Sequence, residues 1–482
     1  MTGSAYQFLA DQPQVLPARE QMALTLMVHV ILVPLGVALP FITLLMNYLG
    51  LRRNDAVAFQ LARRWSTVMA IQFAVGVVTG TVISLEFGLL WPGLMGRWGD
   101  VFGTGFGIEA WAFFLEAILI SIYLYGWKRL SPRTHFLLGL PIPLTSLLGA
   151  FGILSANAWM NTPQGFTLDS AGNPTAVTVE KVLFNPIFGP QYWHFIAAAY
   201  MTAGFLVASV YAVGWLRGRR DRYHRLGFLV PFTVAAIVTP VQMALGDGLA
   251  RSVFREQPAK FSTIEIVWTT GPNQAEYLYG RLQPDGTIDG GIKIPGLDSF
   301  RAGFSRSTVV PGLSEVPAEN RPTAGEATIA HWAFDTMVGI ATVLLLLALW
   351  YGLAWLRRRD LPRSRWFYRC AALAGIASVV AVESGWITAE VGRQPWIVWE
   401  QMKVAEAVTN ITAGPIWASF AILVIVYALI AWAFVGLLLR MRLRWRGQDA
   451  QLAREETGEP AELARAAEPA RVEDSARAEA AT

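Results

Sequence analysis

The chain has 482 residues, 54% of them hydrophobic, with a mean hydropathy of +0.40 and 19 tryptophans. This composition excludes a set of ordinary soluble domains and predicts an all-α polytopic membrane protein. The net charge is only +4, which gives no reason to expect binding to nucleic acid. The distribution of the charges along the chain is more informative than their sum.

Apolar segments of membrane length recur along the sequence. A helix that crosses the hydrocarbon needs about 20 consecutive apolar residues. Residues 1–20 are polar and contain proline, so no signal peptide is expected and the first span is expected to act as its own insertion signal. The single cysteine, Cys370, allows neither an internal disulfide nor a Cys-x-x-Cys-His haem attachment. Nine spans are predicted, at residues 22–49, 66–90, 106–127, 135–159, 192–216, 226–245, 332–356, 366–388 and 415–439.

Basic side chains mark alternate connections between the spans. Clusters of lysine and arginine follow the first, third, fifth, seventh and ninth spans, and the other short connections hold few basic residues. Cytoplasmic loops carry an excess of lysine and arginine. The N-terminus is therefore predicted to lie outside and the C-terminus inside, in a bacterial cytoplasmic (inner) membrane.

One connection, residues 246–331, is far longer than the others and is predicted to face outward. It is rich in glycine and proline, and Pro284-Asp285-Gly286 between two apolar stretches predicts a β-hairpin. Loops of this length are usually functional or disordered. The chain thus divides into six helices in residues 1–245, this loop, three helices in residues 332–446, and an Ala/Glu/Arg tail in residues 447–482 that is expected to be disordered.

Polar side chains within the apolar spans gather in their predicted outer halves. A carboxylate there is strongly unfavourable unless a cation, a hydrogen-bond donor or a metal compensates it. Glu109 and Glu116 differ by only about 20° around a helix, so they point the same way and suggest a proton path or a ligand with its relay. Imidazole, thioether and carboxylate groups also bind haem iron. The set comprises His29, Glu109, Glu116, His194, Met337 and Glu383.

Each of these residues also has a simpler interpretation. His29 and His194 can be amphipathic side chains near the membrane surface, and Met337 can be ordinary packing. The carboxylates can form interhelical hydrogen bonds or ion pairs. His135 and His224 lie among arginines and are expected to be solvated interface residues.

Taken together and in order, these motifs resemble subunit I of the cytochrome bd-type quinol oxidases, including the cyanide-insensitive branch. The resemblance covers almost all of the chain before the tail, and the ordered set on nine spans is highly specific. The motifs are Arg19-x-Gln-x-Ala-Leu-Thr-x-Met-x-His29-x-x-x-Val-Pro34, Gly76-Val-x-Thr-Gly80, Ile-Glu109 leading to Ala-Phe-Phe-Leu-Glu116, Ala-Asn157-x-Trp-Met160, Asn185-Pro186, Gly246-Asp247, and Val-Glu383-x-Gly-Trp386 running to Gly-Arg393-Gln-Pro-Trp396.

The resemblance implies three haems and a ligand for each. His194 and Met337 would be the axial ligands of a low-spin haem b. His29 would serve the oxygen-reducing haem, and Glu383 its high-spin haem b partner. Glu109 would lie at or near the oxygen-reducing haem, which is either haem d or a third haem b, because the protein supplies the ligand and not the macrocycle.

The resemblance also implies roles in proton and quinol chemistry. Glu116 would belong to the proton route, and Trp386 and Arg393 would help to bind the cofactors. Lys260 and Glu265 match the quinol-binding segment of the family, where a cation and a carboxylate could bind a quinol head group and accept its protons. Judged without the family, this pair would be expected to be solvated.

Two departures from the family limit these inferences. The loop of about 85 residues lacks the long insertion of some members, so it is a short-loop form. Asp335 stands where some members have an arginine two residues before the methionine ligand. The reversed charge should change the redox tuning of the low-spin haem.

The expected function is that of the haem-bearing subunit of a terminal oxidase, which oxidises quinol on the outer side and reduces dioxygen to water, building a proton gradient without pumping. A second membrane subunit, subunit II, and a small single-span subunit are the expected partners. Two alternatives stay open. One is a haem-bearing quinone oxidoreductase that reduces no oxygen, and the other is a transporter that uses buried carboxylates and binds no haem.

Overall fold

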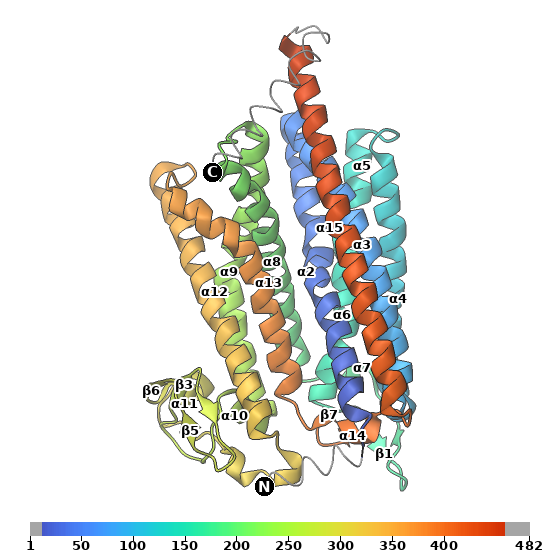
Figure 1. Cartoon of the computed structure of the whole chain (residues 1–482), viewed down its shortest axis with the longest axis vertical. Coiled ribbons are helices and arrows are strands. Elements are labelled where there is room, and N and C mark those ends of the chain that lie inside the picture. The colour runs from blue at the N-terminus through green and yellow to red at the C-terminus, as the bar shows by residue number, and fades with distance from the viewer. Residues whose placement is uncertain (1–11, 458–482) are drawn as a thin grey trace. The chain divides into compact units, whose positions relative to one another are not determined.

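The computed structural model describes residues 12–457 and divides the chain into two units, residues 1–423 and 424–482 (Figure 1). Within the described residues, nine helices are long and apolar enough to cross a membrane, which confirms the predicted number. In Figure 1 the long helices of the first unit run alongside one another. They are α2 (Val15–Arg53), α3 (Ala56–Leu90), α4 (Pro92–Gly126), α5 (Pro132–Gly139) with α6 (Pro141–Asn161), α8 (Phe188–Leu216), α9 (Arg222–Glu256), α12 (Ala324–Arg358) and α13 (Arg365–Val391). The remaining long helix, α15 (Ala413–Thr457), begins in the first unit and continues into the second.

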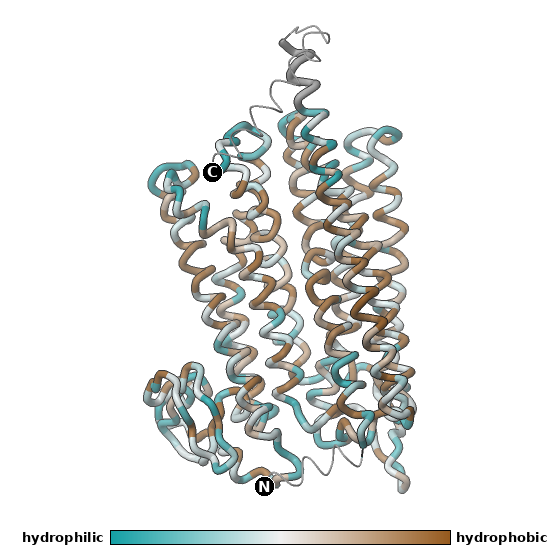
Figure 2. The backbone as a smooth tube through the Cα atoms, viewed as in Figure 1, coloured by the Kyte–Doolittle hydropathy of each residue, from teal (hydrophilic) through white to brown (hydrophobic). Residues whose placement is uncertain are grey.

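Most of these helices extend beyond the apolar spans that the sequence predicts. Hydropathy detects only the hydrocarbon-crossing part, whereas capping residues set the ends. Asp55 accepts hydrogen bonds from two backbone N–H groups at the start of α3, and Thr323 and Glu326 form a capping box at the start of α12. Figure 2 shows the hydrophobic colouring along the helices and the hydrophilic colouring mainly at their ends and in the loops.

Small residues allow close packing between the helices. α8 packs against α9 and α13, α12 against α13, α2 against α3, and α4 against α6. A Cβ atom added to Gly105 of α4 would lie 2.7 Å from the carbonyl oxygen of Gly152 in α6, so only glycine fits there. Membrane helices associate through such small residues, because lipid tails give them no hydrophobic driving force.

The long loop spans residues 257–323 rather than 246–331, because α9 continues to Glu256 and α12 begins at Ala324. The predicted hairpin is confirmed, and its turn closes with a hydrogen bond from Gln283 N–H to the Thr287 carbonyl at 2.8 Å. The loop contains α10 (Pro258–Ile264), the pairs β3 (Glu276–Leu278) with β6 (Ile292–Ile294) and β4 (Arg281–Leu282) with β5 (Ile288–Asp289), α11 (Leu297–Gly303), η1 (Leu313–Glu315) and η2 (Ala318–Asn320).

Short elements also join the other helices on the side of this loop. They are β1 (Thr167–Leu168) paired with β2 (Pro174–Thr175), α7 (Val179–Leu183), β7 (Trp396–Val398) paired with β8 (Met402–Lys403), and α14 (Val404–Ala407). The predicted tail begins as helix, because α15 continues to Thr457, and residues 458–482 lie outside the described part.

His135 is buried, and its prediction as a solvated residue is wrong. Only 2% of it is exposed, and its ring centroid lies 4.2 Å from that of Tyr123 and 4.1 Å from that of Trp127. Its Nε2–H donates to the Tyr123 carbonyl at 2.8 Å, so Nδ1 can accept from Asn47 at 3.3 Å. Packing against these aromatic side chains at the end of α4 therefore buries His135, although arginines lie near it in the sequence. His224 is half-buried and pairs with Asp221 at 2.6 Å.

Candidate active site

His29 in α2 is held by Thr79 of α3. Its Nδ1 lies 2.8 Å from the Thr79 hydroxyl, which itself lies 3.1 Å from the Gly76 carbonyl. If the hydroxyl gives its single proton to that carbonyl, Nδ1–H must be the donor to Thr79, and the lone pair of Nε2 stays free. A Cβ atom added to Gly80 would lie 3.4 Å from Cε1 of the same ring. His29 is thus oriented with one ring nitrogen available to a ligand.

His194 in α8 lies against α9. The amide nitrogen of Gln242 is 3.3 Å from each of its ring nitrogens. A Cβ atom added to Gly246 would lie 3.1 Å from Cε1 of His194, so a larger residue would crowd the ring. The contact with His194 therefore explains why the first residue of the Gly246-Asp247 motif is glycine.

Met337 and Glu383 belong to the adjoining helices α12 and α13. A Cβ atom added to Gly385 would lie only 2.8 Å from the sulfur of Met337. Both carboxyl oxygens of Glu383 are buried and have no hydrogen-bond partner among the described residues. A carboxylate left in this way requires a cation, a donor or a metal. Trp386, one turn further along α13, is half-buried.

Glu109 and Glu116 of α4 both lie against α6, as their spacing predicts. Ser146 of α6 donates a hydrogen bond of 2.6 Å to Glu116, which is 7% exposed. Next to Glu109, a Cβ atom added to Gly152 of α6 would meet the Glu109 backbone nitrogen at 2.8 Å. The two carboxylates therefore share one helix interface.

Sequence reasoning did not single out Glu86 of α3, although a carboxylate near the end of an apolar span is itself a signal. It is 3% exposed and accepts hydrogen bonds from Gln21 at 2.9 Å and Thr25 at 3.0 Å. Its second oxygen has no partner in the described part of the chain. Thr25 precedes His29 by one helical turn, so this carboxylate adjoins the face of α2 that carries the histidine.

Lys260 and Arg393 meet in a buried polar network. Lys260, 5% exposed, donates to Asn161 at 2.8 Å. Burial, reinforced by the charge of Arg393, lowers the pKa of Lys260 to about 7. Arg393 pairs with Glu390 at 2.5 Å, and Asn157 donates to the other oxygen of Glu390 at 3.2 Å. The prediction that Lys260 is a solvated loop residue is wrong.

Arg393 retains unused donors. It is 4% exposed, and its Nε and Nη1 have no hydrogen-bond partner among residues 12–457. A buried guanidinium with two unused donors fits a carboxylate of a bound group, because such donors bind planar anions in pairs. Haem carries carboxylates of this kind on its propionate side chains.

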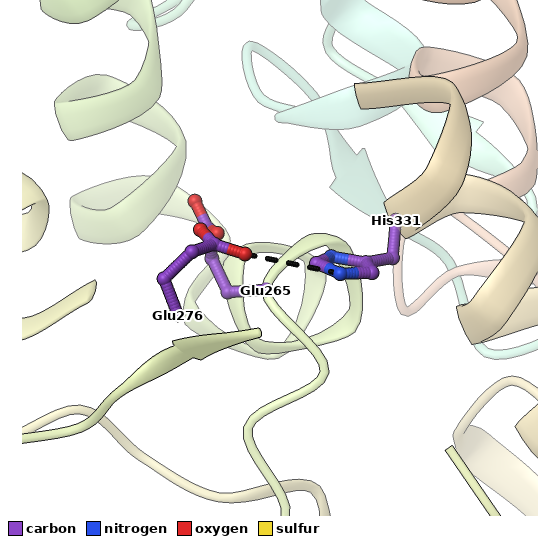
Figure 3. Close-up of side chains that lie close together, drawn as sticks. All are labelled: Glu265, Glu276 and His331. Atoms are coloured by element: carbon purple, nitrogen blue, oxygen red, sulfur yellow. Dashed lines mark ion pairs between the residues drawn. The ribbon is translucent and has the colours of Figure 1, made fainter. Parts of the chain in front are cut away.

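Glu265, which directly follows α10, belongs to a second cluster, and Figure 3 shows it with Glu276 and His331. The guanidinium of Arg301 pairs with Glu276, lies 3.1 Å from Glu265 and lies 3.9 Å from Asp298. Glu265 is 1% exposed, and Glu276 and Asp298 are fully buried. The cluster therefore brings three loop carboxyl groups out of contact with water around a half-buried arginine, which also overturns a solvated position for Glu265.

His331 completes this cluster as a cation. Its Nδ1 lies 2.8 Å from the Ile264 carbonyl and its Nε2 lies 2.9 Å from the Tyr277 carbonyl. Carbonyl oxygens only accept hydrogen bonds, so both ring nitrogens must carry protons. Asp335 at 3.3 Å and Glu276 at 3.8 Å supply the opposite charge.

The protonated His331 also decides against a metal ion here. Glu265, Glu276 and His331 offer ligand atoms within 4.8 Å of one another, a spacing that suits a metal. A metal ligand needs a free nitrogen lone pair, and both nitrogens of His331 are committed to carbonyls. Arg301 already provides positive charge between the two glutamates.

The carboxyl groups of the cluster share protons unequally. Burial raises the pKa of Glu265 well above its usual range, and burial together with the charge of Glu276 raises the pKa of Asp298 to about 9. Burial has the same tendency at Glu276, but a hydrogen bond from Glu265 and the charges of Arg301 and His331 hold its pKa below the usual range. With Glu265 and Asp298 neutral, the Glu276 carboxylate remains paired with Arg301.

The structure thus brings the predicted residues together in groups. Met337 and Glu383 share the α12–α13 pair, which packs against the α8–α9 pair that holds His194. His29 lies at the α2–α3 contact and Glu109 with Glu116 at the α4–α6 contact. Lys260 and Glu265 face different clusters, and no hydrogen bond or ion pair joins them in the described structure.

Imidazole, thioether and carboxylate groups within a bundle of apolar helices are typical of membrane oxidoreductases that bind haem. Residues 17–444 match a single family, and the chain belongs to it: cytochrome bd terminal oxidase subunit I. Members are subunits of terminal quinol oxidases, so the chain is an oxidoreductase of bacterial electron transport with haem cofactors, a quinol substrate and a subunit II partner.

Two curated relatives and one solved structure illustrate the similarity. Cytochrome bd ubiquinol oxidase subunit 1 of Bacillus subtilis (strain 168) is 31% identical over 439 residues, covering 88% of this chain and 92% of the relative. Cytochrome bd-II ubiquinol oxidase subunit 1 of Escherichia coli (strain K12) is 27% identical over 488 residues, covering 87% and 95%. The bd oxidase structure from Geobacillus thermodenitrificans matches with a TM-score of 0.83 and 35% identity, covering 89% of this chain and 98% of that one.

Proposed function

We propose that the chain binds three haems through the residues described above and catalyses the oxidation of quinol by dioxygen. His194 and Met337 hold a low-spin haem b, and His29 and Glu383 serve a pair of high-spin haems, one of them haem d or a third haem b. When bound, the haems supply one-electron transfer and the reduction of dioxygen to water. The observation that carries this assignment is Glu383, whose two buried oxygens have no partner in the described structure.

Close packing of the ligands against glycines supports the same assignment. Each candidate axial ligand lies against a glycine of the neighbouring helix: His29 against Gly80, His194 against Gly246, and Met337 against Gly385. A larger residue at these positions would crowd the ligand side chain, so the glycines keep each ligand in place. Arg393 contributes two unused N–H donors for a propionate.

Quinol is oxidised in this proposal beside α10. Lys260, with a pKa of about 7, is partly neutral at physiological pH and accepts a proton from the quinol hydroxyl. Glu265 is held neutral and donates a hydrogen bond to a quinone oxygen. The site therefore binds the head group through both residues and takes up one quinol proton at Lys260.

Protons for water formation follow a separate route. Glu116, joined to Ser146, and Glu109 lie on one face of α4 and form a proton path toward the oxygen-reducing haem. The basic clusters at the opposite ends of the helices from the long loop indicate an N-terminus outside and a C-terminus inside a bacterial inner membrane. Quinol protons are then released outside and oxygen protons are taken up from inside, so a gradient forms without a pump. Subunit II completes the enzyme, with a small single-span subunit as a further partner.

Difference spectra of the purified complex test this function against both alternatives. A far-red band in the reduced-minus-oxidised spectrum identifies haem d, and b-type bands with a fraction that binds carbon monoxide identify a variant with haem b alone. Haem without a carbon-monoxide-reactive fraction contradicts oxygen reduction and leaves the quinone oxidoreductase. A preparation with no haem signal refutes the proposal and leaves the transporter.

A further inference from the structure

A cavity of about 250 Å³ lies at the end of the helices opposite the long loop. It is formed by the end of α8, the connection to α9, the connection before α13 and the first turn of α13, and Figure 1 shows these segments at one end of the first unit. It is smaller than a typical site for a drug-sized molecule, about 300 to 1,000 Å³. Its size suits a small polar head group.

Three arginines line this cavity without an opposite charge. Arg220 belongs to the α8–α9 connection, and Arg363 and Arg365 to the start of α13. All three side chains are exposed, and no carboxylate lines the cavity. No ion pair joins any of the three to a carboxylate among the described residues. Three like charges around one small cavity repel one another unless an anion enters it.

The carboxylates that could neutralise these arginines are paired with other residues. Asp360 pairs with Arg225 at 2.7 Å. Asp221 pairs with His224 at 2.6 Å. Asp55 pairs with Arg222. These pairs leave the three cavity arginines without an ion pair of their own in the described structure, and only Arg363 also feels the charge of Asp360.

A buried hydroxyl and a rigid aromatic wall complete the site. Tyr368 lines the cavity, is 2% exposed, and its hydroxyl has no hydrogen-bond partner in the described structure. Its ring stacks on Trp215 with a centroid distance of 5.1 Å and an interplanar angle of 17°. Arg220 lies over the Trp215 ring at 5.8 Å. The cavity thus offers an unused hydrogen-bond donor beside three guanidinium groups.

We propose that this cavity binds the phosphate of an anionic phospholipid from the leaflet that adjoins this end of the helices. Guanidinium groups bind phosphate oxygens in pairs, and a tyrosine hydroxyl can donate one more hydrogen bond. The cavity lies where the apolar spans end and basic connections begin, the depth of lipid head groups. Trp366, next to Arg365 in α13, is 65% exposed, and Leu356 near the end of α12 is 70% exposed, so this end of the helices offers apolar surface for acyl chains. This site is independent of the proposed haem and quinol sites.

The test is a lipid titration of the purified complex after removal of lipid in an uncharged detergent. Phosphatidylglycerol is added in mixed micelles, and the bound lipid is counted by native mass spectrometry. Phosphatidylcholine and inorganic phosphate are titrated separately, because the first has a phosphate but no net charge and the second has no acyl chains. We expect phosphatidylglycerol to bind more tightly than either.

Matched variants locate the binding. A basic residue near a membrane contributes about 1 kcal/mol, or roughly fivefold in affinity, so R363Q should weaken binding roughly fivefold and R220Q/R363Q/R365Q roughly a hundredfold. Y368F should weaken it severalfold. The control R52Q/R53Q/R129Q removes three exposed arginines from other basic connections and should bind like the unaltered protein. Unchanged haem spectra verify that each variant is folded.

Two results overturn the proposal. The first is a triple cavity variant, correctly folded, that binds phosphatidylglycerol no more weakly than the control variant. The second is inorganic phosphate that binds as tightly as phosphatidylglycerol and displaces it, which assigns the cavity to a free anion rather than to a lipid.

Discussion

Replacing Asp298 by asparagine should stabilise the long loop at neutral pH. Asp298 is fully buried, and neither of its oxygens has a hydrogen-bond partner among the described residues. It faces Arg301 at 3.9 Å, with Glu265, Glu276, His331 and Asp335 as the other charged or titratable groups of the cluster. Because burial and the charge of Glu276 raise its pKa to about 9, Asp298 is neutral in the folded loop.

The size of the effect follows from proton linkage. An unfolded aspartate has a pKa of about 3.9. A carboxyl group with a raised pKa contributes its full stability below the unfolded pKa and loses it as the pH rises toward the folded value, because the unfolded chain releases the proton first. Each pH unit in this window is worth about 1.4 kcal/mol. By pH 7 the loss reaches roughly 4 kcal/mol, an upper limit because the cluster shares its protons.

Asparagine has the shape of the neutral acid but no proton to lose. In D298N the free energy of opening the loop should therefore be nearly independent of pH in this window, and at pH 7 it should exceed that of the unaltered chain by up to a few kcal/mol. Near pH 4 the two proteins should agree. Hydrogen exchange of peptides from residues 257–303, corrected for the intrinsic pH dependence of exchange, measures the opening free energy.

The exposed Glu319 in the same loop provides the control. E319Q should leave both the opening free energy and its pH dependence unchanged. If D298N opens more readily than the unaltered loop at every pH, Asp298 is ionised in the folded protein and the shared-proton description of the cluster is wrong.

Three further predictions concern the catalytic groups. K260M should reduce kcat/KM for quinol at least tenfold. Because only the neutral amine accepts a proton, kcat/KM of the unaltered enzyme should rise as the pH increases through about 7, and K260M should abolish this rise. Retention of the rise in K260M would contradict the role of Lys260. S146A leaves Glu116 without its donor at 2.6 Å and should slow proton uptake roughly five- to tenfold in a stopped-flow measurement with a pH indicator, with little change in the haem spectra. G246A places a methyl group 3.1 Å from the His194 ring and should shift the low-spin haem b spectrum, whereas G248A, with no atom within 4 Å of the added methyl group, should not; equal spectra for the two variants would refute the position of His194 as a ligand.

The helices and the hairpin were predictable because their signals are local. Apolar length determines where the chain crosses a membrane, and Pro284-Asp285-Gly286 determines where the hairpin turns. The ends of the helices were not predictable from hydropathy, because the last turns of α9 and the first turns of α12 are polar. Capping residues such as Thr323 and Glu326 carry that information instead.

The membrane-embedded part of the site was predictable for a thermodynamic reason. A carboxylate or imidazole in hydrocarbon is so unfavourable that its presence in an apolar span indicates a functional candidate, as with Glu383 and His29. The same residue types in a polar loop carry no such signal. Glu276 and Asp298 look like ordinary solvated residues in the sequence, and only the fold removes them from water and brings them to Arg301.

The short helix α10 explains how the loop and the haem-binding helices act together. Its last carbonyl, that of Ile264, accepts from His331 of α12, the helix that carries Met337. At its other end Lys260 is buried beside Arg393, which follows α13 and Glu383. Seven residues therefore connect the proposed quinol groups to both ligand-bearing helices. In the proposed mechanism, a change in charge at Lys260 or Glu265 on quinol oxidation acts on α12 and α13 through these contacts, because both groups are buried and their charges are weakly screened.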